Sequence, residues 1–308
     1  MAHKETEPSF TDSIIKDLRL DLIANGVVEG FVTGLHKSPF HGFSVEFAEH
    51  RLYNPGESVR SIDWKLYARN EKLFVKKYEE ETNLRCQIII DRSSSMYFPL
   101  ERKNKMYFSV LATASLLYLL QRQRDAYGLS IFSDHIETNI PCRATGSHLK
   151  LLIGELERIL STIPQKSGTS AAETINILAE SFHKRSLVIL FSDLMENMDD
   201  PQTLYSSLQH LKHNKHEVIL FHVLDKSKEM DLDYGNKPFH FIDLESGLEL
   251  KLNPAQIRES YKKKMVDFRN DLLEKCGQNG IEYVETDIEQ GFEKVLLSYL
   301  IKRNRMNT

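Results

Sequence analysis

The chain has 308 residues, of which 41% are hydrophobic, and its 40 basic and 44 acidic residues leave a formal net charge of −4 at pH 7. This balance excludes the strongly basic composition that is typical of nucleic-acid-binding proteins. Gly and Pro number only 14 and 9, so we expect an ordered globular protein rather than a disordered or fibrous one. A chain of this length can form one large domain with an extension, or two domains.

Residues 1–80 form the first predicted unit. We expect a helix over residues 12–24, and a dense polar and aromatic block follows from Arg51 to Arg69. Within residues 41–80, seven basic residues balance seven acidic ones. The block therefore fits two roles, a partner-binding surface or an internal lattice of ion pairs that fixes a loop. The candidate residues for these roles are Arg51, Arg60, Asp63, Trp64, Lys65 and Arg69.

Residues 81–308 form the second predicted unit, in which short apolar runs alternate with longer amphipathic segments. The apolar runs predict strands over residues 87–91, 128–133, 187–193 and 218–224. The longer segments predict helices over residues 103–124, 147–160, 170–182 and 200–213. Hydrophobicity within the strands is continuous, which is typical of a parallel sheet covered on both faces. We therefore predict an α/β fold, a doubly wound, mostly parallel sheet with helices on both faces.

The C-terminal part of the chain continues this pattern. Residues 239–252 predict a hairpin, because Glu245-Ser246-Gly247 separates two short apolar runs. A charged helix is expected over residues 255–276, a strand over 281–285 and a last helix over 290–302.

Membrane insertion and secretion are not expected. The longest uncharged stretch, residues 106–120, is shorter than the roughly 18–20 apolar residues that span a bilayer, so it predicts a buried helix. The three cysteines are widely separated and odd in number, which suits a reducing compartment. The first seven residues lack the apolar core of a signal peptide, so we expect a cytoplasmic protein.

The most informative motif follows the predicted strand 87–91. Asp91, Ser93 and Ser95 place a carboxylate and two hydroxyls at alternate positions, Thr169 precedes the predicted helix 170–182, and Asp193 ends the predicted strand 187–193. Loops at the carboxyl ends of neighbouring parallel strands converge, so we expect these five side chains to meet. Such oxygen ligands predict Mg²⁺, with Mn²⁺ or Ca²⁺ as alternatives. Asp and Ser are also common turn residues, so a loop that binds no metal is the alternative interpretation.

An aspartate after a strand is also compatible with a divalent-metal phosphohydrolase that uses Asp91 as its nucleophile. Phosphatases of the haloacid dehalogenase type have a second aspartate two residues later, whereas this chain has Ser93 there, so the general acid is missing. The sequence also contains no Gly-rich phosphate loop, G-x-S-x-G or HExxH motif. We predict that the protein is not an enzyme.

The block around Arg51 to Arg69, the segment Leu73-Phe74-Val75-Lys76 and the Asp-x-Ser-x-Ser motif after a strand occur together. In this combination the chain resembles the MoxR-associated family catalogued as a domain of unknown function, number 58. The resemblance covers about residues 27–225. The second half is similar to the von Willebrand factor type A fold.

The resemblance implies a metal-ion-dependent adhesion site (MIDAS) formed by Asp91, Ser93, Ser95, Thr169 and Asp193. The open coordination position of its metal would take a carboxylate from a partner protein. The resemblance also implies a MoxR-type AAA+ ATPase as a partner, acting with this chain on client proteins in chaperone-like maturation or remodelling. The alternative is a structural scaffold with a non-functional metal site, whose contacts come from the amino-terminal block.

Overall fold

The computed structural model describes residues 20, 23–26, 28–29, 50–52, 67, 73–76, 84–100, 103–162, 171–183, 185–195, 201–244 and 247–307. Contacts divide the chain into two compact units, residues 1–31 with 84–308 and residues 32–83. Leu20, Ala24 and Val28 are buried and lie at helical spacing, so the early helix belongs to the larger unit. The sequence pattern alone predicts one boundary, after residue 80, and so assigns the early helix to the first unit. The pattern does not show where Leu20, Ala24 and Val28 are buried.

The smaller unit contains a two-stranded antiparallel sheet. Its strands are β1 (His50–Leu52) and β2 (Phe74–Lys76), and Arg51 stands opposite Val75 in the ladder.

The larger unit is built on a six-stranded sheet with the order β10-β7-β6-β3-β4-β5. Five strands are parallel, and β5 pairs with β4 in the antiparallel direction. The central strands are buried along almost their whole length, which explains their continuous hydrophobicity. Their bounds are β3 (Arg85–Asp91), β4 (Ala126–Phe132), β5 (Ile136–Arg143), β6 (Leu187–Ser192), β7 (Glu217–Leu224) and β10 (Glu282–Asp287).

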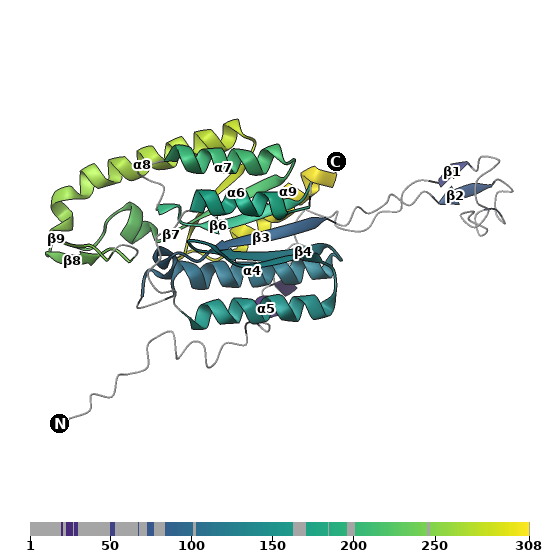
Figure 1. The fold of residues 1–308 in the computed structure, drawn as a ribbon, viewed down its shortest axis with the longest axis horizontal. Coiled ribbons are helices and arrows are strands. Elements are labelled where there is room, and N and C mark those ends of the chain that lie inside the picture. Colours follow the sequence, from purple (N-terminus) through teal and green to yellow (C-terminus); the bar gives the residue numbers. More distant parts are fainter. Residues whose placement is uncertain are drawn as a thin grey trace, which may run out of the picture. The chain divides into compact units, whose positions relative to one another are not determined.

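Helices cover both faces of this sheet (Figure 1). On one face lie α4 (Lys105–Arg122) and α5 (Gly146–Ser161), and α9 (Glu293–Asn307) packs against α4. On the other face lie α6 (Ala171–Ser181), α7 (Pro201–His213) and α8 (Pro254–Gln278). The predicted fold class, a doubly wound, mostly parallel sheet with helices on both faces, is confirmed.

Alternate residues of the strands supply the two halves of the core. Val188 and Leu190 of β6 join one buried cluster with Leu208 of α7 and Leu272 of α8. The opposite face is covered by α4, whose residues are buried nearly all round. The sequence predicts this burial, because α4 is uncharged for most of its length. In the described part of the chain, no helix is both long and apolar enough to cross a membrane.

One strand of the larger unit differs from the sequence prediction. The edge strand β5 is not predicted, because its burial alternates and its Pro141 disfavours a central strand position. The hairpin is confirmed as β8 (Phe239–Ile242) paired with β9 (Glu249–Leu252). The predicted helix over residues 12–24 lies mostly outside the described residues, of which 20 and 23–26 are helical.

Candidate metal and partner site

The carboxyl ends of two neighbouring strands bring the first residues of the site together. Asp91 ends β3 and Ser192 ends β6, and the parallel register pairs Ile90 with Phe191 one step earlier. The Ser192 hydroxyl donates a hydrogen bond of 2.6 Å to Oδ2 of Asp91. Asp193 follows directly, so two carboxylates from distant parts of the sequence lie at one edge of the sheet.

The Asp-x-Ser-x-Ser loop folds back on its own aspartate. The backbone N–H of Ser93 donates to Oδ1 of Asp91 at 2.8 Å, and the Ser93 and Ser95 hydroxyl oxygens are 3.0 Å apart. Asp91 and Ser93 are buried and Ser95 is half-buried. Ser95 also lies close enough to Asp193 to lower the pKa of that carboxyl. Four of the five predicted ligands therefore lie together.

The environment gives the two carboxylates different protonation behaviour. Burial, together with the nearby charge of Asp193, raises the pKa of Asp91 to about 6. Burial by itself would also raise the pKa of Asp193, but the Lys105 ammonium outweighs burial and brings that pKa below its ordinary value. At neutral pH both groups are anionic, and Asp193 holds its charge more firmly.

Lys105 is a charged group at this site that the sequence does not predict. Its Nζ is fully buried and donates to Oδ2 of Asp193 at 2.6 Å, and it also forms a short hydrogen bond with Glu229. Glu229 lies in the π-helical turn Lys226–Met230 after β7, where its other oxygen accepts from the N–H of Asp225 at 2.8 Å. The two carboxylates raise the pKa of Lys105 above its ordinary value, so the ammonium stays charged.

His222 supports Asp193 from behind. Its Nε2 lies 2.9 Å from the backbone oxygen of Asp193, and its Nδ1 lies 2.8 Å from the Tyr283 hydroxyl. Burial lowers the pKa of His222 to about 4, so the imidazole is neutral at pH 7 and its Nε2–H can donate to that carbonyl. This contact fixes the backbone at the end of β6.

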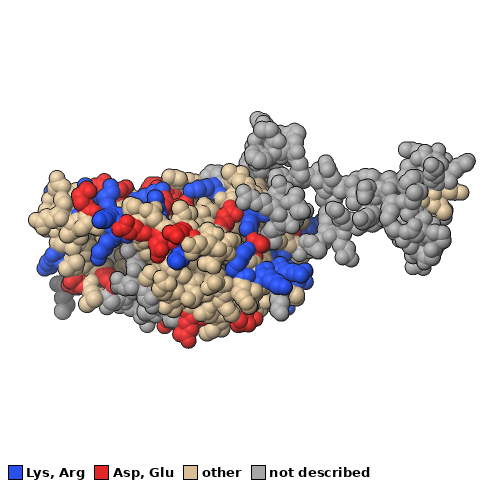
Figure 2. All heavy atoms as spheres, turned by 90° about the horizontal axis from the view of Figure 1, so that it is seen from above, with Lys and Arg blue, Asp and Glu red and all other residues tan. Residues whose placement is uncertain are grey.

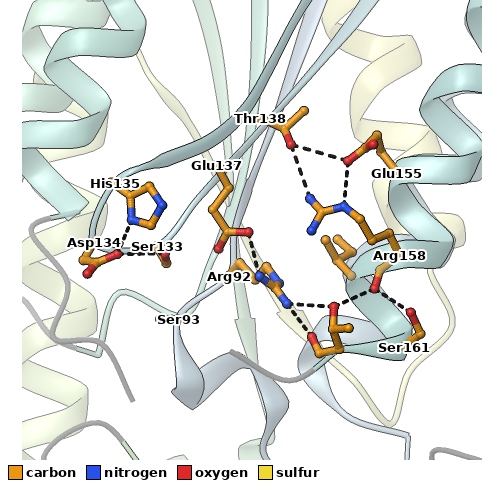
Figure 3. A network of polar contacts seen from close by, with 12 residues as sticks. Arg92, Ser93, Ser133, Asp134, His135, Glu137, Thr138, Glu155, Arg158 and Ser161 are labelled. Atoms are coloured by element: carbon orange, nitrogen blue, oxygen red, sulfur yellow. Dashed lines mark hydrogen bonds and ion pairs between the residues drawn. The ribbon is translucent and has the colours of Figure 1, made fainter. Parts of the chain in front are cut away.

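Arg92, the residue between Asp91 and Ser93, anchors the loop from the other side (Figure 3). Its guanidinium donates to Glu137 of β5 at 2.6 Å, to the Tyr97 hydroxyl at 3.1 Å and to the Thr162 hydroxyl at 3.0 Å, and it makes a further short bond to the Thr162 carbonyl. The Arg92 and Glu137 side chains are 8% and 12% exposed. The loop is therefore tied to β5 and to the end of α5, which limits its movement.

The donor set fits a hard divalent cation. In the described residues no group of three or more His, Cys, Asp or Glu side chains is placed to hold a metal ion. Two carboxylates and two hydroxyls do meet, and each carboxylate oxygen keeps a lone pair beyond its present hydrogen bond. Mg²⁺ needs few protein ligands, because it retains several waters.

The other predicted site residues are only partly covered by the structure. Thr169, the fifth predicted ligand, lies outside the described residues, and so do Arg60, Asp63, Trp64, Lys65 and Arg69. Arg51 lies in β1. The partner surface and the internal ion-pair lattice therefore both stay predictions for the amino-terminal block.

Basic and acidic side chains are mixed over the surface of the larger unit (Figure 2). Several form pairs across neighbouring elements, such as Lys302 with Glu217 at 2.7 Å and Lys226 with Glu285 at 2.5 Å. These pairs place opposite charges side by side in the described part of the larger unit.

Comparison with known proteins gives the chain a family. A family model described as "Protein of unknown function DUF58" matches residues 49–271. The chain is 26% identical over 267 residues to the uncharacterized protein Rv1480 of Mycobacterium tuberculosis, covering 84% of this chain and 80% of the relative. Similar solved structures include the conserved hypothetical protein BatB from Bacteroides thetaiotaomicron, with a TM-score of 0.47, 16% identity and coverage of 73% of this chain and 98% of that one. The SpRpn10 VWA domain has a TM-score of 0.35, 11% identity and coverage of 69% and 93%. Because the family model matches well over half of its residues, the chain belongs to the DUF58 family.

Proposed function

We propose that this chain is a non-enzymatic protein-binding module whose binding depends on a divalent cation, with Mg²⁺ as the first candidate and Mn²⁺ or Ca²⁺ as alternatives. One observation carries the proposal: Asp91, Ser93, Ser95 and Asp193 lie together at the ends of two adjacent strands. Their mutual hydrogen bonds hold them in place before any ligand arrives. A preorganised set of hard oxygens is the arrangement that such cations prefer.

Within this proposal the protein residues divide the work. Asp91 and Asp193 supply negative charge, and the neutral hydroxyls of Ser93 and Ser95 supply coordination without charge. A cation bound there provides a positive centre that an incoming carboxylate can reach. The partner is therefore expected to present an exposed Asp or Glu side chain.

The proposed partner is a MoxR-type AAA+ ATPase, together with its client proteins. Family membership and the resemblance described from the sequence support this partner. In such a pair the ATPase supplies the energy and this chain supplies contacts in the maturation or remodelling of clients.

A second candidate is a scaffold whose oxygen cluster binds no metal. The contact between Lys105 and Asp193 favours it, because the ammonium already neutralises one of the two carboxylates. A phosphohydrolase has less support, since Ser93 occupies the position of a general acid.

Calorimetric titration with Mg²⁺ tests the metal proposal. We expect saturable heat for the wild type and its loss in Asp91→Ala and Asp193→Ala. Asp134→Ala is the matched control, because Asp134 also follows a parallel strand at this edge but is exposed beside His135. Equal heats in all four proteins would refute the metal site, and phosphatase turnover that depends on Asp91 would refute the non-enzymatic assignment.

The partner proposal needs a separate measurement. We expect the immobilised full chain to capture a MoxR-type ATPase in Mg²⁺ and to release it in EDTA. Capture that survives EDTA and Asp91→Ala, but fails after charge reversal at Arg60 or Asp63, would support the scaffold instead.

A further inference from the structure

Lys105 occupies a position that disfavours a positive charge. It is the first residue of α4, where the helix dipole is positive, and its side chain is fully buried. Its neighbour Met106 and most of the following turns are apolar and equally buried. A methionine would fill such a site without the desolvation penalty of a buried ammonium. We therefore expect the positive charge of Lys105 to have its effect on the groups that the ammonium contacts.

Those groups belong to the oxygen cluster and to the segment beyond it. Lys105 Nζ contacts Oδ2 of Asp193 at 2.6 Å, and the N–H of Met195 contacts Oδ1 at 3.3 Å. On its other side the ammonium meets Glu229. Both oxygens of Asp193 thus already accept a hydrogen bond, and one of them accepts it from a full positive charge.

We propose that Lys105 is a built-in cation that shares Asp193 with the divalent ion and thereby limits the affinity of the site for that ion. This inference rests on the proposed function for the identity of the site. A carboxylate that is partly neutralised by an ammonium donates less charge to a metal, and the two positive charges repel each other. The metal then keeps more of its own charge for an incoming carboxylate.

Glu229 sets the strength of this effect. Two carboxylates, Asp193 and Glu229, contact one ammonium, and Asp91 adds a further negative charge beside Asp193, so the cluster stays negative and still attracts a divalent cation. Glu229 draws Lys105 away from Asp193, because both acids compete for the same three ammonium hydrogens. Removing Glu229 alone turns Lys105 more fully toward Asp193.

Weak retention of the metal by the chain alone has a functional consequence. The carboxylate of a partner adds a negative charge and an oxygen ligand, which compensate for the part of Asp193 that Lys105 neutralises. Metal and partner then strengthen each other's binding by the same factor, as linkage requires. The site favours a metal-bound complex over a metal-bound free protein.

The test compares Mg²⁺ affinity by calorimetry in two variants of the full chain that shift the balance in opposite directions. The double variant Lys105→Met/Glu229→Met keeps the net charge and removes the competing ammonium, so that Asp193 has no cationic partner until a metal ion binds. We expect it to bind Mg²⁺ at least about tenfold more tightly, which corresponds to about 1.4 kcal/mol. Glu229→Gln is expected to bind Mg²⁺ several-fold more weakly than the wild type.

A matched control uses an ion pair at the opposite end of a strand. Lys212 and Glu217 lie 2.9 Å apart, and Glu217 begins β7. Lys212→Met/Glu217→Met should leave Mg²⁺ affinity unchanged. The rise of the unfolding temperature with added Mg²⁺ gives a second readout, and we expect it to be larger in Lys105→Met/Glu229→Met than in the wild type.

The outcomes separate this inference from the proposed function. If the wild type binds Mg²⁺ and neither variant changes the affinity, Lys105 does not compete and the inference fails while the metal proposal stands. If only the double variant binds Mg²⁺, Lys105 excludes the ion from the wild-type site instead of sharing Asp193 with it, and both the inference and the metal proposal are wrong. If no protein binds Mg²⁺ by either readout, both are wrong.

Discussion

The Ser192 hydroxyl donates a 2.6 Å hydrogen bond to Oδ2 of Asp91 across the junction between β6 and β3. The same oxygen of Ser192 accepts the backbone N–H of Leu194 at 3.0 Å. One buried hydroxyl therefore orients the Asp91 carboxylate and also accepts a hydrogen bond from the backbone directly after Asp193. This double role makes Ser192 part of the site although it is not one of the predicted ligands.

Ser192→Ala should therefore lower both stability and metal affinity. The change leaves a buried carboxylate oxygen and a buried N–H without this partner, and we expect a loss of about 2 kcal/mol in the free energy of unfolding. Urea denaturation measures that loss. Ser115→Ala is the control, because its buried hydroxyl donates to a carbonyl within α4. Equal stability loss in the two variants would show that Ser192 has no special role.

Arg92 leads to a second prediction about the loop. Arg92→Met removes a guanidinium whose partner Glu137 is 12% exposed, and leaves that carboxylate unpaired. We expect a loss of about 3 kcal/mol in urea unfolding. The exposed pair of Arg158 with Glu155 provides the comparison, since Arg158→Met should cost less than about 1 kcal/mol. Similar losses in both variants would contradict the anchoring role of Arg92.

Gly128 of β4 is required by the close approach of two neighbouring strands. A Cβ placed there would lie 2.6 Å from the carbonyl oxygen of Ile140 and 2.9 Å from the nitrogen of Cys142, both in the backbone of β5. We expect Gly128→Ala to destabilise the protein by about 1–3 kcal/mol, because the β5 backbone must move. Gly154→Ala serves as the control in α5, where no atom beyond the neighbouring residues and the nearby backbone of the helix lies within 4 Å of the new Cβ.

The expected sign for that control is opposite. Gly154 lies in the exposed middle of a helix, so alanine should stabilise the protein by up to about 1 kcal/mol. The thermal unfolding temperatures of Gly128→Ala and Gly154→Ala, each compared with the wild type, measure these two opposite effects. A tolerated alanine at position 128 would mean that β5 is not held against β4 as the structure has it.

The two halves of the site differ in how far the sequence predicts them. Asp91 and Asp193 could be predicted, because each follows a continuous apolar run and strand ends converge in a parallel sheet. Lys105 and Glu229 could not, since their contact depends on how the start of α4 meets the turn after β7. One local signal was available: Lys105 begins an uncharged helix at the end where its dipole disfavours a cation.

The fold was predictable for a related reason. Strands buried on both faces have a strong local signal, which is why β3, β4, β6 and β7 were found with bounds shifted by two residues or fewer. The edge strand β5 has one exposed face and a proline, and its pairing depends on β4 rather than on its own sequence. Its antiparallel direction is a tertiary property that no local pattern reports.

A last prediction concerns pH and lies away from the oxygen cluster. His216 is 1% exposed near the start of β7, and the N–H of Ser186 donates to its Nδ1 at 3.3 Å. Burial lowers the pKa of His216 below its ordinary value of 6.5. The unfolded chain therefore binds a proton that the folded protein excludes, so stability contributed by neutral His216 is lost as the pH falls below about 6.5.

His216→Gln should remove this part of the pH dependence. Urea unfolding at pH 7.5 and at pH 5.5 gives, for each protein, the change in the free energy of unfolding on acidification. The change in the wild type minus the change in the variant is the contribution of His216. Taking this difference cancels the opposite contribution of Asp91, whose raised pKa favours the folded state at lower pH. His213→Gln is the control, because that side chain is exposed on α7. If His216→Gln loses as much stability on acidification as the wild type, the imidazole is not held neutral by the fold.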